Sequence, residues 1–326
     1  MGMAERRTTR LAPSPTGALH LGNARTFLIN WAIARQRGWR VVLRIEDLDG
    51  PRVKTAADEQ AIDVLQWLGL DWDEGPVWQR QEVDVYGAAM ESLNDKGLLY
   101  PCQCTRREIE QAQSAPHADD HELRYPGTCR TSGSSESGVS SFEFGDAAQT
   151  TAWRLRVPDE EVAFVDQVHG EWRVNVQQQV GDFVVASKQG LPAYQLAVVV
   201  DDARQGVTDV VRGDDLLDAT ARQILLWRML ELGPPPCWWH VPLVIGEDGR
   251  RLAKRHGDTR VATYRELGVS ADRVVGLIAK WSGVGEGEYE PMSARTFAER
   301  FKMERLPREA VTFTKADDAW LRDGAV

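Results

Sequence analysis

Two parts of this sequence have residues that could hold a triphosphate, and the first surrounds His20. His20 lies between Gly17 and Gly22, in a turn that directly precedes an amphipathic helical pattern. A helix N-terminus presents N–H groups and a positive dipole end, so phosphate could sit near Gly22 and Asn23. His20 could donate to a phosphate oxygen during transfer. A turn histidine that hydrogen-bonds to the backbone is the alternative interpretation.

The second part is the basic loop EDGRRLAKRHGD. It carries Arg250, Arg251, Lys254 and Arg255 between glycines. A mobile basic loop can close over a triphosphate and neutralise the charge that develops on a leaving pyrophosphate. A solvated surface loop is the alternative.

Two arginines at strand ends could bind a carboxylate. Arg10 ends the first apolar segment, and Arg212 lies in VVRGDD at the end of another. A guanidinium suits a carboxylate because its planar fork matches both oxygens. Glu46 could accept from an ammonium group, and Tyr194 offers a hydroxyl. Structural salt bridges are an equally compatible explanation for the two arginines.

Three of the four cysteines indicate a metal site. Cys102 and Cys104 form a CxC pair, and Cys129 follows after a gap of 24 residues. Three thiolates are zinc ligands, and a fourth ligand must come from another residue type. His117, His121 and Tyr125 all lie between Cys104 and Cys129, and on ligand chemistry alone imidazole is favoured over a phenol.

These groups need a scaffold that joins strand ends to a helix N-terminus, and the stretch from Thr9 to Asp49 predicts one. A short strand ends near Pro13. A helix with apolar positions between 24 and 32 then ends at Gly38, and a buried strand covers 41–45. This is a βαβ unit with parallel strands and a right-handed crossover. Ligands in such sheets lie beyond the carboxyl ends of the strands.

The remaining pattern predicts an α/β fold, a Rossmann-like doubly wound parallel sheet with two additions. Residues 1–99 form its first half, with helices at 55–68 and 83–96 joined by an acidic loop. Residues 100–178 form an inserted, zinc-bearing α+β subdomain whose strands lie in 152–176. Residues 179–259 resume the parent fold, and the apolar runs in 182–202 predict strands buried on both faces. Residues 260–326 form a small C-terminal helical domain with one apolar face over 274–281.

Composition limits the function classes. The 326 residues are 42% hydrophobic and 27% charged, as in ordinary globular proteins. No apolar run reaches bilayer length and the N-terminus has no apolar leader, so we expect a cytoplasmic protein without membrane contact. The net charge of −10 argues against binding nucleic acid over the whole surface, but permits a local basic face. We expect a monomer.

The motifs resemble a known family. PSPTGALHLGN resembles the HIGH signature of class I aminoacyl-tRNA synthetases in the wording of the glutamyl branch, and RIEDLD is similar to that branch. RRLAK resembles the KMSKS loop, with Lys254 on the second lysine, although Arg251, Ala253 and Arg255 depart from it. The resemblance implies ATP-dependent activation of an amino acid by positioning and charge stabilisation, with His20 and Lys254 catalytic and Mg²⁺ accompanying the ATP.

The resemblance also assigns binding residues. It implies that L-glutamate is bound by Arg10, Leu11, Ala12, Pro13, Ser14, Glu46, Tyr194 and Arg212. It implies that ATP is bound by His20, Gly22, Asn23 and Lys254. CxC followed by YPGTCR is similar to a shortened glutamyl subgroup in which tyrosine is the fourth zinc ligand. That similarity implies structural Zn²⁺ on Cys102, Cys104, Tyr125 and Cys129, with His121 in reserve.

Two further features point to the shortened subgroup. The sequence ends at Val326, where full-length glutamyl enzymes continue into an anticodon-binding domain, and Gln195 stands where those enzymes usually carry histidine. The resemblance implies that glutamate is activated without tRNA and then transferred to the queuosine base at the wobble position of tRNA(Asp). The catalytic face would meet the anticodon loop, whose unstacked bases are the easiest to reach. Because 260–326 looks like a stem-contact region, a truncated enzyme that charges tRNA(Glu) is the alternative.

Overall fold

The computed structural model describes residues 6–48, 52–112, 123–130, 142, 144, 151–250, 252 and 258–323. Its strands are β1 (Thr8–Leu11), β2 (Arg40–Ile45), β3 (Glu74–Trp78), β4 (Leu99–Cys102), β5 (Ala152–Leu155), β6 (Glu161–Asp166), β7 (Gly170–Asn175), β8 (Val184–Ala186), β9 (Asp209–Gly213), β10 (Cys237–Val241), β11 (Val244–Ile245) and β12 (Val311–Thr312). Its α-helices are α1 (Leu21–Arg37), α2 (Ala57–Trp67), α3 (Asp84–Asp95), α4 (Arg106–Ala112), α5 (Val176–Gln179), α6 (Tyr194–Arg204), α7 (Ala219–Met229), α8 (Val261–Glu266), α9 (Ala271–Trp281), α10 (Ala294–Arg300) and α11 (Lys315–Arg322).

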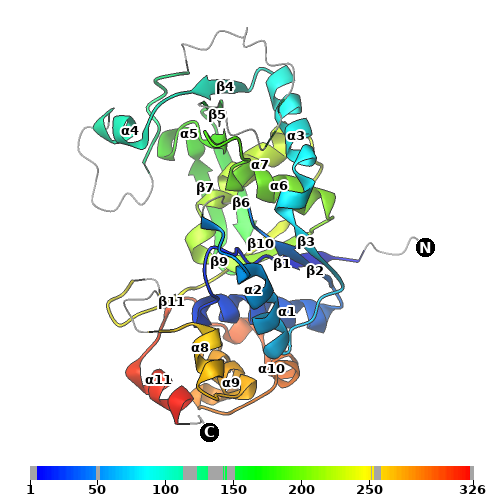
Figure 1. Ribbon diagram of the computed structural model, residues 1–326, viewed down its shortest axis with the longest axis vertical. Coiled ribbons are helices and arrows are strands. Elements are labelled where there is room, and N and C mark those ends of the chain that lie inside the picture. Colours follow the sequence, from blue (N-terminus) through cyan, green and yellow to red (C-terminus); the bar gives the residue numbers. More distant parts are fainter. Residues whose placement is uncertain are drawn as a thin grey trace.

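Parallel strands form the centre of the molecule (Figure 1). β1, β2 and β3 pair in that order and are all parallel. A second sheet has the order β7-β6-β10-β9, in which β10 is parallel to both β6 and β9. β9 lies beside β1, since the N–H of Thr208 donates to the carbonyl oxygen of Thr8 at 2.9 Å. The predicted α/β fold with a parallel sheet is confirmed.

The predicted βαβ unit is present. β1 pairs with β2 in parallel, with Thr9 opposite Val41, and α1 makes the crossover between them. The helix ends where Gly38 takes the left-handed conformation at φ 67°, which glycine adopts without steric cost. The unit therefore places the start of α1 at the carboxyl end of β1.

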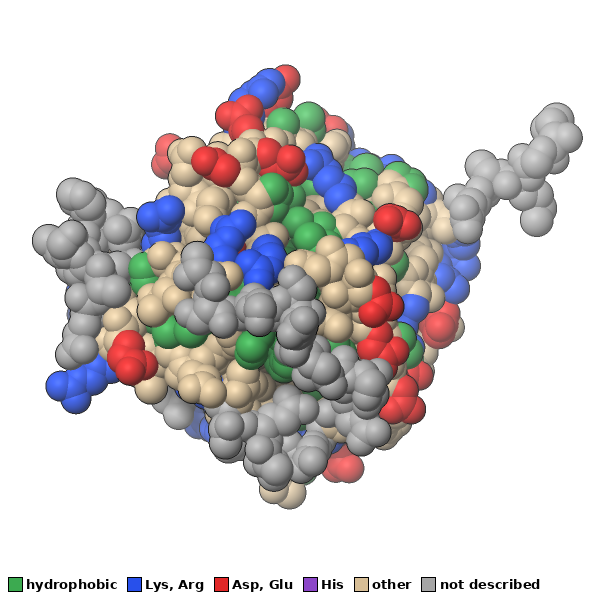
Figure 2. All heavy atoms as spheres, turned by 90° about the horizontal axis from the view of Figure 1, so that it is seen from above, with side chains coloured by type: hydrophobic (Ala, Val, Ile, Leu, Met, Phe, Trp, Pro, Cys, Tyr) green, Lys and Arg blue, Asp and Glu red, His purple; other side chains and the backbone are tan. Residues whose placement is uncertain are grey.

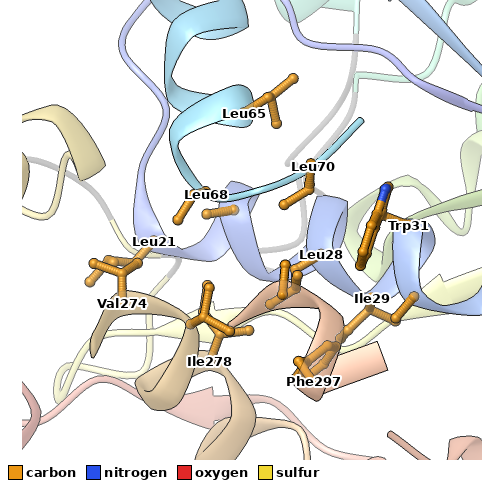
Figure 3. Close-up of a cluster of buried hydrophobic side chains, with 14 of the residues drawn as sticks. Leu21, Leu28, Ile29, Trp31, Leu65, Leu68, Leu70, Val274, Ile278 and Phe297 are labelled. Atoms are coloured by element: carbon orange, nitrogen blue, oxygen red, sulfur yellow. The ribbon is translucent and has the colours of Figure 1, made fainter. Parts of the chain in front are cut away.

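A shared hydrophobic core joins α1 to the C-terminal helices. Leu28 and Ile29 of α1 pack with Ile278 of α9 and Phe297 of α10, and Leu65 of α2 lies in the same cluster (Figure 3). The apolar face predicted over 274–281 is buried in this core. The C-terminal helices lie below α1, while β4 and β5 lie at the opposite end of the molecule (Figure 1).

Two secondary-structure predictions were wrong. The run Tyr194–Arg204 is the helix α6, not a buried strand. It packs against α3, α7 and β8, and burial on several sides removes the periodicity that separates a buried helix from a buried strand. The acidic segment near residue 75 was expected to be a loop, but its residues Glu74–Trp78 form β3 on the edge of β2.

Sheet pairing differs from the expected partition of the chain. β6 and β7, expected within the 100–178 insertion, pair with β10 in the sheet that contains β9. β8, expected in the second half of the parent fold, pairs antiparallel with β5 in the sheet β4-β5-β8. These are long-range pairings that local sequence patterns do not encode. Every helix within the described residues is too short or too polar to span a bilayer.

The shared core gives a stability prediction. Phe297 is fully buried against α1, so Phe297→Ala should lower the free energy of unfolding by about 3–5 kcal/mol. Arg295→Ala on the same helix is the control, because its side chain is 89% exposed and such surface changes cost roughly 0.5 kcal/mol or less. Urea unfolding of the two variants measures the difference. Equal midpoints with equal slopes would contradict a core shared by α1 and α10.

Candidate active site

A cavity of about 610 Å³ opens at the carboxyl ends of β1, β2 and β9. Most of the residues predicted for glutamate and ATP line it, although they come from five separate segments. These are Arg10, Ala12, Ser14, His20, Gly22, Asn23, Glu46, Tyr194 and Arg212. The structure therefore brings the two predicted sets together in one cavity.

Two predicted site residues, Leu11 and Pro13, do not line this cavity, and a third lies outside the described residues. Leu11 is fully buried in the core under β1. Pro13 is also buried, and its carbonyl oxygen accepts from the N–H of Glu46 at 3.0 Å, which holds the end of β2 against the segment after β1. Lys254 lies outside the described residues. Leu252, two positions before it, does line the cavity.

The start of α1 is held against the segment that follows the basic loop. The His20 ring places Nδ1 at 3.0 Å from the Thr259 hydroxyl, and the N–H of Leu21 donates to the Thr259 carbonyl oxygen. The Asn23 side chain accepts from the N–H of His20 at 3.4 Å, as a capping residue does. His20 and the two ends of the basic loop are therefore at the same edge of the sheet.

Charges beside Arg10 are balanced within the protein. The Nε of Arg10 donates to Asp202 at 3.1 Å, and Arg44 pairs with the same carboxylate at 2.8 Å and with Glu46 at 3.4 Å. Burial alone would raise the pKa of Asp202, but Arg10 and Arg44 outweigh it and the net shift is downward. Burial raises the pKa of Glu46, although Arg44 and Arg10 oppose this shift. Arg44 also lies 3.9 Å from Asp201, so two cations face three carboxylates here.

Arg212 differs from Arg10 because its partners are neutral. Its side chain is 5% exposed, and its three nitrogens donate to acceptors on β10, on α7 and in the turn before α7. The acceptors are Nε2 of His240 at 3.0 Å, Oε1 of Gln223 at 2.8 Å, Oγ1 of Thr220 at 2.9 Å and the Leu216 carbonyl oxygen at 3.2 Å. Among the described residues, none places a carboxylate within 4.0 Å of this guanidinium. Burial lowers the pKa of Arg212, yet a guanidinium remains charged at neutral pH.

His240 connects Arg212 to a buried acid. Its Nδ1 lies 2.7 Å from Oδ2 of Asp166, and both side chains are fully buried. Burial lowers the pKa of His240 to about 4, although the hydrogen bond to Asp166 opposes this shift. The ring is therefore neutral at neutral pH, with its hydrogen on Nδ1 and an acceptor at Nε2. The sequence analysis did not select Asp166 or His240, because each lies within an apolar strand pattern without a motif.

The three clustered cysteines are together in space. The Sγ atoms of Cys102, Cys104 and Cys129 all lie within 4.8 Å of one another. The Tyr125 hydroxyl lies 3.5 Å from Cys102 Sγ and 3.8 Å from Cys104 Sγ. Ligands on a tetrahedral zinc are roughly 3.5–3.8 Å apart when Zn–S is about 2.3 Å, so these four groups fit a metal ion. His121 lies outside the described residues.

The surface above the insertion carries both signs of charge. Figure 2 views the molecule from the β4 end, and Lys and Arg side chains are interspersed with Asp and Glu on the described surface.

A larger cavity of about 880 Å³ adjoins the active-site cavity, and the two share Tyr194, Asp215 and Leu216. The active-site cavity thus continues toward the cysteine cluster.

Comparison with known proteins places the chain in a family. Residues 7–320 match the model described as tRNA synthetases class I (E and Q), catalytic domain. The glutamyl-Q tRNA(Asp) synthetase of Rhodopirellula baltica is 46% identical, over 92% of this chain and 94% of that relative. The glutamate–tRNA ligase of Geobacter sulfurreducens is 38% identical, over 96% of this chain and 64% of that relative. The crystal structure of the glutamate–tRNA synthetase from Elizabethkingia anophelis shares the fold, with a TM-score of 0.78 at 24% identity and coverage of 97% of this chain and 70% of that chain.

The fold, the cavity and these matches define a class I tRNA synthetase of the E and Q family, which makes the protein a ligase. Within that family, the chain belongs to the glutamyl-Q tRNA(Asp) synthetases.

The buried histidine predicts a pH dependence of stability. His240 has a pKa of about 4 in the folded protein and 6.5 as its ordinary value. Between pH 4 and pH 6.5 the histidine is protonated in the unfolded chain and neutral in the folded protein. Its contribution to the free energy of unfolding is therefore complete above about pH 6.5 and falls as the pH decreases toward 4. The loss should approach about 1.4 kcal/mol per pH unit. Urea unfolding near pH 7 and near pH 5 should show a smaller loss for His240→Asn than for the unmodified protein, and equal losses would contradict a buried neutral ring.

Proposed function

We propose that this protein activates L-glutamate with ATP to form glutamyl-adenylate without tRNA, and then transfers glutamate to the queuosine base at the wobble position of tRNA(Asp). The single observation that carries this proposal is the cavity that joins the Arg212 guanidinium, Glu46 and the start of α1. The resemblance to glutamyl-Q tRNA(Asp) synthetases supports the second step. We also propose that the protein acts as a cytoplasmic monomer.

The charge balance supports an acidic amino acid as the ligand. Arg10 is already paired with Asp202, whereas Arg212 is a buried cation with neutral partners. A buried cation whose partners are neutral attracts a carboxylate strongly, because the low dielectric strengthens the attraction and no described carboxylate is paired with it. The side-chain carboxylate of glutamate would therefore bind Arg212, with Arg10 and Tyr194 on the same cavity wall. Glu46 would accept from the α-ammonium group. Glutamine would leave the charge of Arg212 unbalanced.

The phosphates of ATP would lie over the start of α1. The N–H groups and dipole of the helix, at Gly22 and Asn23, favour negative charge there. The α-carboxylate of glutamate attacks the α-phosphorus, one P–O bond forms, and the bond to pyrophosphate breaks. His20 and Lys254 would stabilise the charge that develops on the leaving group, and no side-chain nucleophile is required. Mg²⁺ would accompany the ATP.

Transfer follows at the same cavity. A hydroxyl of the queuosine ring would attack the mixed anhydride, forming an ester and releasing AMP. The adjoining cavity of about 880 Å³ gives an approach to the adenylate from the side of the insertion. An unpaired anticodon base can enter such a space without opening a helix.

We also propose that Cys102, Cys104, Tyr125 and Cys129 hold a structural zinc ion. The three thiols lie within 4.8 Å of one another, and the phenol oxygen lies 3.5 and 3.8 Å from two of them, so all four groups are close enough to share one ion. Arg154 donates to Cys102 Sγ at 3.2 Å and stacks on the Tyr125 ring, so a cation compensates the negative ligands. The ion would fix the insertion next to the adjoining cavity.

The two steps can be tested separately. ATP–pyrophosphate exchange should require glutamate and no RNA. With labelled glutamate and ATP, label should appear on tRNA(Asp) bearing queuosine and not on tRNA(Asp) with guanosine at that position. Label that appears only on tRNA(Glu) would instead establish the alternative, a shortened tRNA(Glu)-charging enzyme.

Substitution of Arg212 tests the proposed glutamate pocket. Arg212→Ala should raise the KM for glutamate by about 30-fold or more, because loss of one partner of a buried ion pair costs at least roughly 2 kcal/mol. Arg173→Ala is the matched control, since its side chain is 63% exposed on β7 and pairs with Glu161. An Arg212→Ala enzyme with unchanged glutamate KM would remove Arg212 from the pocket.

Metal analysis tests the zinc proposal. The purified protein should contain about one zinc per chain, and Tyr125→Phe should lose it at a lower chelator concentration because one of four ligands is gone. Cys237→Ser should retain the zinc, since Cys237 is exposed and apart from the cluster. If Tyr125→Phe retains zinc normally while His121→Ala loses it, the fourth ligand is the histidine.

A further inference from the structure

Three buried side chains form a hydrogen-bonded chain across the second sheet. We call Asp166, His240 and Arg212 the relay. His240 is opposite Arg212 in the pairing of β10 with β9, and Asp166 is the last residue of β6 on the other side of β10. The relay therefore runs across three adjacent strands and ends at the glutamate cavity, which only Arg212 reaches.

The far end of the relay is fixed by the backbone. Oδ1 of Asp166 accepts from the N–H groups of Val168 and His169, each at 2.9 Å. Oδ2 accepts from the backbone N–H of His240 at 3.1 Å and faces its Nδ1 at 2.7 Å. An ionised carboxylate accepts only, so the ring hydrogen must be on Nδ1. Nε2 is then an acceptor, and it faces the Nε–H of Arg212 at 3.0 Å.

We propose that Asp166 and His240 are positioning residues for glutamate: they fix the rotation of the Arg212 guanidinium without neutralising its charge. The inference rests on the proposed function, because Arg212 is taken to bind the side-chain carboxylate. Neither residue touches the substrate. Both act through Arg212, as the hydrogen-bonding partners of metal-ligand histidines act through the ligand.

The contrast with Arg10 supports this role. The Nε of Arg10 is held directly by the Asp202 carboxylate, which offsets part of its charge and is shared with Arg44. The Nε of Arg212 is held equally well, but the negative charge is one imidazole ring further away. A carboxylate in place of His240 would fix Arg212 and also compete with the substrate. A neutral ring fixes the geometry and leaves the cation for the ligand.

The other hydrogen bonds of Arg212 hold only its two Nη atoms. Thr220 and Leu216 both accept from Nη2, and Gln223 accepts from Nη1 through an amide that itself donates to Gln195. His240 is the partner of Nε among the described residues. Trp238 lies 5.0 Å from the Arg212 guanidinium carbon and covers its face, so the plane of the fork is held from two directions.

Two substitutions at one position separate a positioning role from a merely structural one. His240→Asn can still donate to Asp166 from the position of Nδ1, but has no acceptor at the position of Nε2. His240→Gln can place an oxygen near the position of Nε2, but loses the donor to Asp166. If the relay positions Arg212, His240→Asn should raise the KM for glutamate more than His240→Gln does. If the hydrogen bond to Asp166 is what matters, the order should be reversed.

A third substitution acts without changing any atom next to Arg212. In Asp166→Asn the amide can donate to Nδ1, which shifts the ring hydrogen to Nε2 and sets it against the Nε–H of Arg212. A tautomer change of this kind disables a catalytic histidine in serine proteases. We expect Asp166→Asn to raise the KM for glutamate about tenfold to a hundredfold, the range for one hydrogen bond to a charged group.

The experiment is ATP–pyrophosphate exchange with the full-length protein, with the KM measured separately for glutamate and ATP. The supporting result is a raised glutamate KM for His240→Asn and Asp166→Asn, a smaller change for His240→Gln, and an ATP KM within about twofold in all three. Val162→Ala is the control for general destabilisation, because Val162 is fully buried on β6 with Asp166 but outside the relay. Its thermal midpoint should fall while both KM values stay constant.

Three results would overturn the inference. Unchanged glutamate KM in the three relay variants would remove the relay while leaving the proposed function intact. Equal rises in both KM values, matched by Val162→Ala, would show a structural effect only. If the unmodified protein shows no glutamate-dependent exchange, the proposed function fails and the relay fails with it. If Asp166→Asn does not fold, the ratio of the glutamate KM of His240→Asn to that of His240→Gln still tests whether the relay positions Arg212.

Discussion

A buried guanidinium that has no carboxylate partner among the described residues is the constraint on which this site depends. Burying an unpaired cation is costly, and the cost is reduced here by neutral acceptors on every nitrogen of Arg212. Those acceptors come from β10, from α7 and from the turn before α7, so three chain segments must meet for one side chain to be tolerated. The structure around Arg212 therefore keeps a positive charge buried at the edge of the cavity, where an anionic ligand gains the most from it.

The strand order explains how the remaining groups reach that charge. β1 and β9 are neighbours, although about 200 residues separate them in sequence. After β1 the chain continues to β2 on one side, and after β9 it continues to β10 on the other. A crevice forms between the two connections. Arg10 and Arg212 enter it from the two strands, Glu46 from the end of β2, and the start of α1 closes one side. Two guanidinium groups, a carboxylate and a helix N-terminus thus meet at one cavity.

The sequence was informative where the interactions are local, and much less so where they are not. The βαβ unit could be predicted because the pattern of α1, its end at Gly38 and the buried β2 are all written within about 40 residues. The helix α6 could not, because its run of valines is buried on several sides and carries no usable period. The pairing of β6 with β10 joins segments far apart in sequence. For the same reason Asp166 and His240 could not be predicted from the sequence, because their hydrogen bond joins residues 74 positions apart.

Buried arginines also connect the site to distant parts of the fold. Arg25, on the second turn of α1, donates to the carbonyl oxygens of Pro242, which follows β10, and of Trp281 at the end of α9. Burial lowers the pKa of Arg25 to about 10, so it remains charged at neutral pH. One side chain thus ties the helix whose start lines the cavity to the residue that follows β10 and to the C-terminal helices. Because Thr259, just before α8, also lies within hydrogen-bonding distance of His20, the C-terminal part of the chain is attached to the start of α1 at two points.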